Sequence, residues 1–337
     1  MSKPAYVFSL LLCTSIVFLS VIPVLGQSVI DGVLTDEETM APIAYANIGI
    51  LNTPVGTISN PDGTFSISIS EQYAGDSLLF AALGYERKSF SIRDILQHDV
   101  LRVTLKEQST VLKNITVKSK KLKSTGSYDL GNRHFNVGSL YIDSVAAGSA
   151  MALLIENKYP DYHEGLHIPY YIRRARLRIS YNTFDRFKIR VRFLAVDPLT
   201  SLPGRDLVQE SIISTSGMRK GWLDFDLAKY KIRIKESSFF VVFEWLIDDN
   251  DRVELLEHYR EFRRQFPKLV TRDTLSVDGE KIAYSSWHGF RAGTSFGSSN
   301  NRFAIDNYKC YYRNNSYGKW RRSSLVLCAS VTIENFD

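Results

Sequence analysis

Alternation of apolar and polar residues is the clearest signal in the first third of the chain. Phe65, Ile67 and Ile69 alternate with serines, which predicts a strand with one buried and one solvated face. The preceding Asn60-Pro61-Asp62-Gly63 has the composition of a tight turn. Short runs of β-branched and aromatic residues predict further strands at 29–34, 45–51, 77–83, 85–92 and 100–105. These close spacings predict a small β-sandwich over residues 27–118.

Strand signals return after residue 135, where aromatic residues become more frequent. Turn residues at Pro198, Pro203-Gly204 and Ser216-Gly217 separate several of these runs. The predicted strands are 150–156, 171–181, 186–196, 207–214, 221–227, 231–235, 238–246, 281–286, 302–312 and 324–333. Many short strands without alternating helices predict a second, jelly-roll-like β-sandwich over residues 135–337, and an all-β protein as a whole.

One segment of the second domain has helical periodicity. Its apolar side chains recur every three or four residues, Asn250 or Asp251 can cap its start, and arginines precede the terminating Pro267. We expect a single amphipathic helix over residues 251–265, inserted between strands. Such a helix either closes one end of the sandwich or acts as a lid or docking element.

The N-terminus has the layout of a secretory signal peptide. Lys3 precedes an apolar stretch at 7–21, Pro23 ends it, and small residues follow before Gln27. A membrane anchor would need about 20 apolar residues and a stop-transfer flank, and the flank is missing. We therefore expect cleavage after residues 1–26. Since no later stretch is long and apolar enough to span a bilayer, we expect an exported protein without a transmembrane span, in the periplasm or associated with the outer membrane or cell surface.

The first domain also carries the residues of a known family. The matching positions are Gly32, Val33, Asp36, Pro42, Tyr45-Ala46-Asn47-Ile48, Gly56-Thr57, Asn60, Asp62-Gly63, Phe65, Gly84-Tyr85, Leu105, Leu112, Ile115 and Val117. This pattern resembles the carboxypeptidase-regulatory-like domain family, which has a transthyretin-like fold. The resemblance implies a non-catalytic module. In that family it often precedes outer-membrane nutrient transporters or sits on exported proteins of bacteria that harvest glycans. The sequence that follows is too short for a transporter's plug and barrel.

Composition supports a folded protein and shows where the charge lies. The 337 residues are 44% hydrophobic and 23% charged, too apolar for a disordered chain. Residues 119–134 are polar and lysine-containing, and are predicted to be a solvated linker. Residues 171–235 contain 15 basic and 6 acidic residues, a net charge of +9, whereas the whole chain has a net charge of +6.

The basic residues follow the strand period. One set is Arg174, Arg176 and Arg178; the next strand carries Lys188, Arg190 and Arg192. Period two places each set on one face of its strand. If these two strands pair as a hairpin, the arginines share an exposed face, and an anion, an acidic partner or a carboxylate would relieve their repulsion. Alternatively, solvent and scattered acidic residues balance them.

Candidate partners for this basic face are an acidic glycan, lipopolysaccharide or another envelope protein. Nucleic acid is not expected for an exported protein, although the charge would allow it. Trp287 and Trp320, beside loop residues, are candidate platforms for stacking on a sugar ring. Trp245 lies in an apolar run and is expected in the core.

Three motifs resemble catalytic or metal sites but lack the required context. His163-Glu164-Gly165-Leu166-His167 matches H-E-x-x-H, yet prolines bracket it, so the helix that zinc ligation needs is not expected. Gly293-Thr294-Ser295-Phe296-Gly297 matches G-x-S-x-G, but no histidine follows it, and we expect a glycine-rich loop. Asp248-Asp249-Asn250-Asp251 lacks the EF-hand spacing. We expect no catalytic residue, resident metal or cofactor.

Three cysteines exclude a disulfide-dense scaffold. Cys13 would leave with the signal peptide, and Cys310 and Cys328 flank a turn-rich stretch between two strand-like runs. A hairpin centred on Lys319 would place them opposite each other as a disulfide. The alternative is two separate buried thiols.

Together these observations predict an exported, non-catalytic binding or accessory protein of the cell envelope, with the glycan association implied by the family resemblance. A structural or adhesion protein that docks a partner through its basic sheet is the second hypothesis. An unrecognised hydrolase is the third, and no acid–base constellation in the sequence supports it.

Overall fold

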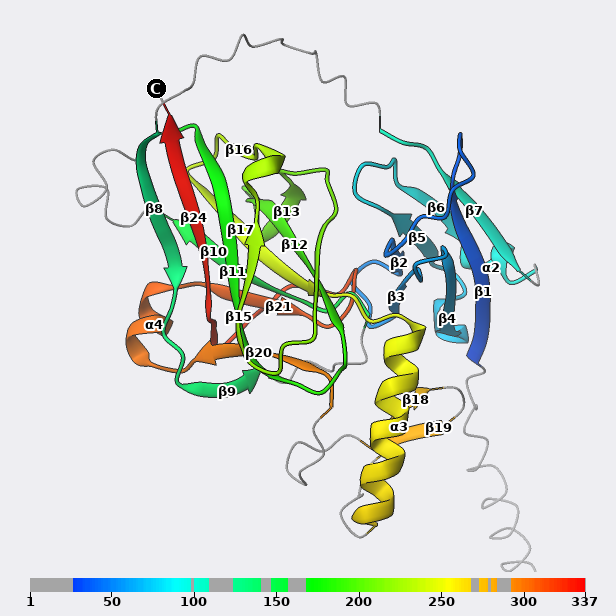
Figure 1. Cartoon of the computed structure of the whole chain (residues 1–337). Coiled ribbons are helices and arrows are strands. Elements are labelled where there is room, and N and C mark those ends of the chain that lie inside the picture. The colour runs from blue at the N-terminus through cyan, green and yellow to red at the C-terminus, as the bar shows by residue number, and fades with distance from the viewer. Residues whose placement is uncertain are drawn as a thin grey trace, which may run out of the picture.

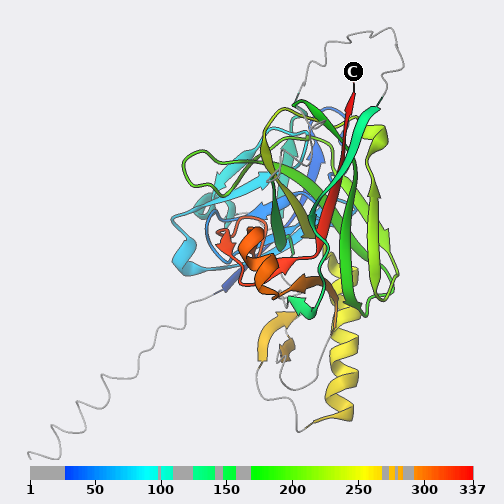
Figure 2. The ribbon, with the colours of Figure 1, turned by 90° about the vertical axis from the view of Figure 1, so that its left-hand side faces the viewer.

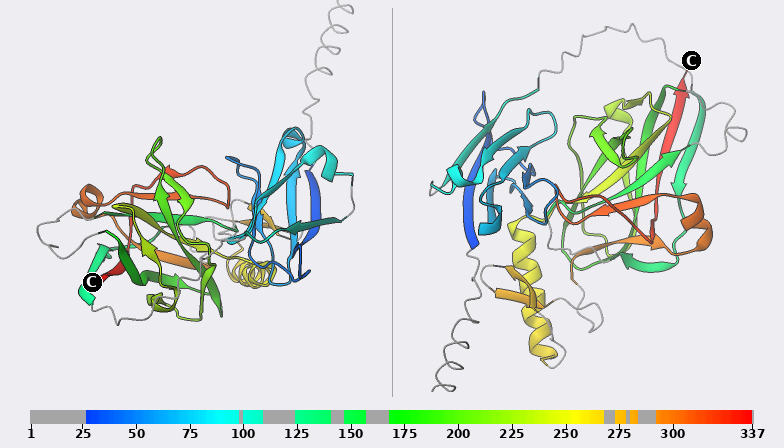
Figure 3. Two further views of the ribbon diagram at one scale, coloured as in Figure 1. Left: turned by 90° about the horizontal axis from the view of Figure 1, so that it is seen from above. Right: turned by 180° about the vertical axis from the view of Figure 1, so that it is seen from behind.

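The computed structural model describes residues 27–97, 100–108, 124–140, 147–156, 168–267, 273–277, 280–283 and 292–336. The predicted signal peptide at 1–26 lies outside these residues. Within them, regular structure is mostly β, as the sequence predicts. Two β regions lie side by side (Figures 1 and 3), an N-terminal region of residues 27–108 and a C-terminal region of residues 124–336. No helix in the described residues is long and apolar enough to cross a membrane.

The N-terminal region is the predicted small β-sandwich. One sheet has the order β4-β1-β7 and the other β3-β2-β5-β6. The elements are β1 (Gln27–Asp36), β2 (Asn47–Gly49), β3 (Gly56–Ile58), β4 (Thr64–Ser70), η1 (Glu71–Tyr73), β5 (Ser77–Ala81), β6 (Lys88–Ser91), α2 (Ile92–Ile95) and β7 (Leu101–Leu105).

Strand β4 shows how sequence alternation builds the core of this region. Phe65, Ile67 and Ile69 are buried and pack in one cluster, while the serines between them are exposed. The predicted turn precedes the strand: Gly63 has φ of +80° and donates its N–H to the Asn60 carbonyl at 2.9 Å. A positive φ suits glycine because it has no Cβ.

The C-terminal region contains two larger sheets, with orders β13-β12-β17-β10-β21-β22 and β23-β20-β11-β24-β8 in the described residues. Strand β14 also pairs with β12; β15 and β16 pair with β11; and β9 pairs with β20. The strands are β8 (Ser124–Asn132), β9 (Val137–Leu140), β10 (Ala150–Glu156), β11 (Tyr170–Asn182), β12 (Phe187–Val196), β13 (Pro203–Asp206), β14 (Ile212–Ser216), β15 (Gly221–Asp226), β16 (Arg233–Ile234), β17 (Ser238–Trp245), β18 (Asp273–Val277), β19 (Glu280–Ala283), β20 (Thr294–Ser299), β21 (Cys310–Arg313), β22 (Arg321–Arg322), β23 (Val326–Leu327) and β24 (Ala329–Phe336).

The core of this region lies between the two sheets. One large cluster takes alternate residues of β12 and β17 from one sheet and of β11 and β24 from the other. Strands β10 and β17 are buried on both faces. The outer face of their sheet is therefore covered too, and this face carries the candidate site described below.

The predicted linker at 119–134 is partly wrong. Residues 124–132 form β8, which pairs antiparallel with β24 from Ala329 to Phe336. Tyr128 and Leu130 pack against the core at alternate positions, a weak apolar period that the surrounding Ser, Gly and Asp residues obscured. Residues 119–123 lie outside the described residues.

The predicted helix is present as α3 (Asp249–Gln265), two residues longer at its start than expected. Asp248, rather than Asn250 or Asp251, is the N-cap: its carboxylate accepts the Asp251 N–H, and the Asp251 carboxylate accepts the Asp248 N–H. Leu255, Leu256 and Tyr259 pack into the large core cluster, so the first half of α3 closes one end of the sandwich. The helix then projects beyond the sheets beside β18 and β19 (Figure 2).

Two local predictions in this region are wrong. Residues 302–307 form the helix α4 (Arg302–Asn307) instead of the start of a strand, because the Asn301 side chain caps it by accepting the Phe303 N–H. The G-x-S-x-G segment is not a loop: all of it after Gly293 belongs to strand β20, which pairs with β11 and β23.

Candidate functional site

A buried acid on β17 organises the outer face of its sheet. Phe239, Val241 and Phe243 point into the core between the sheets, so Glu244 points to the opposite face. Strand register places Glu244 opposite Arg190 on β12 and opposite Ala150 on β10, and Ala150 pairs with Arg313 on β21. The small Ala150 side chain lets Arg313 reach Glu244 across the intervening strand.

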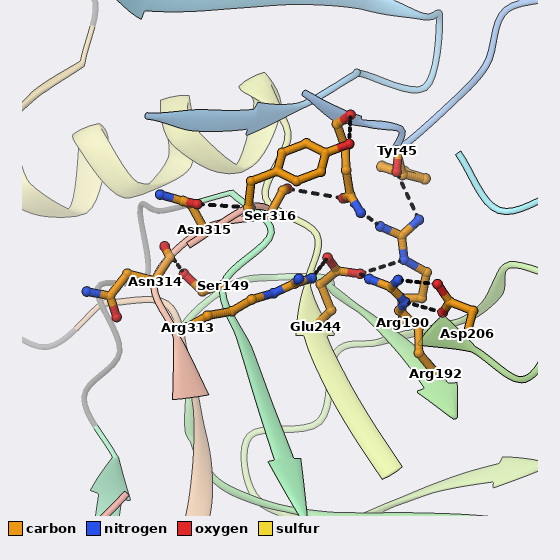
Figure 4. A network of polar contacts seen from close by, with 12 residues as sticks. Tyr45, Ser149, Arg190, Arg192, Asp206, Glu244, Arg313, Asn314, Asn315 and Ser316 are labelled. Atoms are coloured by element: carbon orange, nitrogen blue, oxygen red, sulfur yellow. Dashed lines mark hydrogen bonds and ion pairs between the residues drawn. The ribbon is translucent and has the colours of Figure 1, made fainter. Parts of the chain in front are cut away.

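Three arginines surround the fully buried carboxylate of Glu244 (Figure 4). The Nε of Arg190 donates to Oε2 at 2.8 Å, and Nη2 of Arg313 donates to Oε1 at 3.1 Å. Arg192 lies 3.6 Å from Oε2 through Nη1, and forms a bidentate pair with Asp206 at 2.9 and 2.7 Å. We refer to Arg190, Arg192, Arg313, Glu244 and Asp206 as the arginine cluster.

The charges within the arginine cluster shift the pKa values of Glu244 and Arg313. Burial would raise the pKa of Glu244, but Arg190, Arg192 and Arg313 outweigh burial and lower it to about 2. Burial, reinforced by Arg192, lowers the pKa of Arg313 to about 10 although Glu244 opposes the shift. Glu244 is therefore ionised, and three guanidinium groups share two carboxylates.

Arg190 also joins the two β regions. Its Nη1 donates to the backbone carbonyl of Tyr45 at 2.9 Å and its Nη2 to Oδ1 of Asn47 at 3.2 Å. Arg190 is only 2% exposed, because the N-terminal region covers this part of the sheet. The basic face of this strand, which the sequence predicts to be exposed to solvent, is therefore buried at Arg190.

A loop of the C-terminal region, residues 314–318, completes the junction; we call it the docking loop. Asn315 donates to the Thr53 carbonyl at 3.1 Å, and the Tyr317 carbonyl accepts the Asn52 N–H at 2.9 Å. Ser316 donates to Oδ1 of Asn47 at 3.1 Å. Figure 4 shows the docking loop above the arginine cluster.

Helix α3 adds further contacts between the regions. Asn60 donates to Oδ2 of Asp249 at 2.6 Å and accepts the Asp249 N–H at 3.1 Å. Lys188 lies between Asp248 and Asp251 at 3.0 and 2.8 Å. Burial would lower the pKa of Lys188, but these two carboxylates raise it. The acidic sequence that could have bound calcium thus caps α3 and pairs with a lysine, and no group of three metal-ligating side chains occurs in the described residues.

A cleft of about 970 Å³ opens where the two regions meet above the arginine cluster. Its lining contains six basic side chains and two acidic ones, together with the aromatic residues Tyr85, Tyr317 and Trp320. Arg313 stacks over the ring of Trp320, with its guanidinium carbon 4.9 Å from the ring centroid. A concave surface with aromatic walls and convergent polar groups is the usual form of a ligand site.

The structure separates the two basic sets that a hairpin of the first two basic strands would place on one face. Strand β11, with Arg174, Arg176 and Arg178, and strand β12, with Lys188, Arg190 and Arg192, belong to different sheets, so the hairpin hypothesis is wrong. Each strand pairs instead with later strands of the chain, β11 with β15 and β24, and β12 with β17 and β14.

The β11 arginines lie on the outer face of the other sheet. Arg176 pairs with Asp224 at 2.9 Å. Its guanidinium carbon lies 4.9 Å from the Trp222 ring centroid, and that of Arg178 lies 5.3 Å from the Phe135 ring centroid. Arg174 is exposed. This face is separate from the cleft.

The tryptophan predictions have different outcomes. Trp320 lines the cleft. Trp287 lies outside the described residues. Trp245 is a core residue: it is 4% exposed and donates from Nε1 to the Thr294 carbonyl at 2.9 Å.

The predicted disulfide is absent, and Cys310 and Cys328 are buried free thiols. The hairpin forms between β21 and β22, but it places Ser323 opposite Cys310, with a backbone bond of 2.9 Å. The chain then crosses to the other sheet as β23 before it reaches Cys328. Cys310 belongs to the core between the sheets. Burial raises the pKa of Cys328, and the charge of Arg178, which lies on the outer face of the other sheet, opposes this shift.

Sequence reasoning missed Glu244, Asp206, Arg313 and the docking loop. Glu244 had a usable signal, because an acid inside the apolar run at 239–246 requires a buried partner. The H-E-x-x-H motif at 163–167 lies outside the described residues. Ser295 of the G-x-S-x-G motif lies within a paired strand, which is not the strand–turn–helix of a nucleophile elbow.

Comparison with known proteins confirms the resemblance of the first domain. Residues 30–117 match the family described as CarboxypepD_reg-like domain. No curated protein matches the chain. Two crystal structures of BcpA, the major pilin subunit of Bacillus cereus, one of them of a variant, align with TM-scores of 0.17 and 0.16 and identities of 9% and 10%. Each alignment covers 90% of this chain and 69% of the pilin chain, and TM-scores this low support no inference about fold or function.

Proposed function

We propose that the protein is an exported, non-catalytic binding or accessory protein of the cell envelope, and that a glycan binds in the cleft between its two β regions. The observation that carries this proposal is the cleft itself, a cavity of about 970 Å³ with Trp320, Tyr85 and Tyr317 in its walls. Aromatic side chains combine a large apolar surface with fixed orientation, which suits the flat faces of sugar rings.

The junction that forms the cleft supports a binding role. Hydrogen bonds from Arg190 and from the docking loop, all of them at least partly buried, hold the two regions together. A site whose walls are already held in place loses less conformational entropy when a ligand binds. Export rests on the sequence of residues 1–26, and the glycan on the family resemblance of the first domain.

Binding of the mature protein to a panel of neutral and acidic oligosaccharides, measured by calorimetry, tests this proposal. Trp320→Ala is expected to weaken binding at least tenfold. Trp222→Ala is the matched control, since Trp222 lies on β15, outside the cleft lining. Absence of binding to any saccharide, or equal loss in both variants, would reject the cleft as a glycan site.

Docking of an envelope protein is the second candidate function, and the outer face of β11 favours it. Arg176, Arg178, Trp222 and the 42% exposed Phe135 form an arginine–aromatic surface, and Trp and Arg are enriched at interface hot spots. Trp222→Ala would then abolish capture of a partner in cross-linking of intact envelopes, while Trp320→Ala would leave it unchanged.

A further inference from the structure

We propose that the cleft selects saccharides that carry a negatively charged group, a carboxylate or a phosphate, and that Arg87, Arg313 and Lys319 hold this group. The inference rests on the proposed function, because it names the class of ligand for the same cleft. Two observations support the inference. Basic side chains outnumber acidic ones in the cleft lining, and both acidic side chains already have hydrogen-bond partners.

Neither acidic side chain of the lining is available to balance additional cations. Asp206 is engaged by Arg192 through two bonds. Asp197 accepts the backbone N–H groups of Leu199 and Thr200 at 3.1 and 2.8 Å. These bonds lower the pKa of Asp197, with the Thr200 N–H as the largest cause, and they direct its carboxylate to its own turn.

The arginine cluster at the base of the cleft has excess positive charge. Arg190, Arg192 and Arg313 face only Glu244 and Asp206, so one of the three guanidinium charges has no counterpart. Arg313 contacts Glu244 through Nη2 alone, and its buried Nε has no hydrogen-bond partner. An anion bound above Arg313 would supply the missing negative charge in a partly desolvated setting, where attraction is stronger than in water.

Two further cations line the same cleft, one from each β region. Arg87 belongs to the N-terminal region, between β5 and β6, and Lys319 directly follows the docking loop. Both are exposed, and within the described residues neither side chain forms an ion pair or a hydrogen bond. Burial raises the pKa of Tyr317 to about 12, while Arg87 and Arg313 both oppose this shift. Arg87 and Arg313 therefore both act electrostatically on Tyr317, in the wall of the cleft.

The positions of Arg87, Arg313 and Lys319 in the cleft lining explain why a charged saccharide would bind more tightly than a neutral one. The anion would be held between a residue of each β region, with Trp320 beside it for the sugar ring. Arg205, also in the lining, is occupied by Glu236 at 3.2 Å and is not required.

Calorimetry with the mature full chain tests the inference. The probes are an oligogalacturonate, its methyl-esterified neutral form, and a disaccharide phosphate with its unphosphorylated form. At low ionic strength at least one charged probe is expected to bind at least tenfold more tightly than its neutral form. This preference should shrink at high salt, because exposed charges are screened. The charged probe that binds identifies carboxylate or phosphate as the recognised group.

Variants connect the preference to these residues. Arg87→Gln with Lys319→Gln should lower the ratio of the affinities for the charged and neutral probes, because of the three proposed cations only Arg313 then remains. Arg93→Gln with Arg102→Gln is the control, since it removes the same charge from exposed positions outside the cleft lining. Equal binding of charged and neutral probes, or a preference that is undiminished in the Arg87/Lys319 variant, overturns the inference while the proposed function stands. Failure of every saccharide to bind rejects both.

Discussion

Arg190 donates a hydrogen bond from Nη1 to the backbone carbonyl of Tyr45 at 2.9 Å, so a side chain of one β region bonds the main chain of the other. The same guanidinium pairs with Glu244 through Nε at 2.8 Å and with Asn47 through Nη2. Arg190 therefore neutralises Glu244 in the C-terminal sheet and, with the same guanidinium group, holds the N-terminal region against that sheet.

Arg190→Lys should loosen the junction without unfolding either region. A lysine keeps the charge beside Glu244, but its single ammonium group cannot reproduce the three directed bonds of the planar guanidinium. We expect a larger radius of gyration in small-angle X-ray scattering and faster proteolysis between the regions. Arg205→Lys, at an exposed cleft residue paired with Glu236, is the control and should resemble the wild type.

Glu244→Gln should be strongly destabilising. Loss of the carboxylate leaves Arg190 and Arg313 buried without their counter-charge, and breaking a buried ion pair from one side costs about 3–5 kcal/mol. Urea unfolding measures this loss. Glu236→Gln removes the partly exposed partner of the exposed Arg205 and should change the unfolding free energy by less than about 1 kcal/mol. Similar effects of the two substitutions would contradict the assigned role of Glu244.

Stability should fall at acidic pH through Glu244. Its folded pKa of about 2 lies below the ordinary value of 4.5, so the unfolded state binds the proton more readily. The stabilising contribution is therefore complete above pH 4.5 and disappears as pH falls through 2. We expect the stability difference between the wild type and Glu244→Gln to be constant from pH 7 to 5, then to shrink by about 3 kcal/mol. A difference that does not change below pH 4.5 would contradict this assignment.

Cys310 and Cys328 should behave as inert thiols. Burial raises the pKa of Cys310 to about 12 and that of Cys328 to about 11, so neither forms an appreciable thiolate at neutral pH. Maleimide labelling should be absent in the native protein and reach both cysteines in denaturant, and reductant should leave the melting temperature unchanged. A reductant-sensitive mass decrease of two hydrogens would show that they are bonded.

Local periodicity predicted the elements that lie within one run of sequence. Alternation located β4 and β12 because the side chains of a strand sample its two faces in turn. Continuous apolar runs located β10 and β17, which are buried on both faces. The residues of α3 were found from their helical period. Errors arose where a local polar group decided the outcome: the Asn301 side chain starts a helix, and Asp248 caps α3 earlier than its neighbours suggested.

The alternation within β12 is enough to place its basic side chains on one face, and the residues of the first domain are enough to match a known family. What that basic face contacts depends on the tertiary structure. Strand pairing brings Glu244 beside Arg190, carries Arg313 over Ala150, and sends β11 to another sheet. These are contacts between residues distant in sequence, and their register depends on which strands pair. No local pattern of charges specifies that choice.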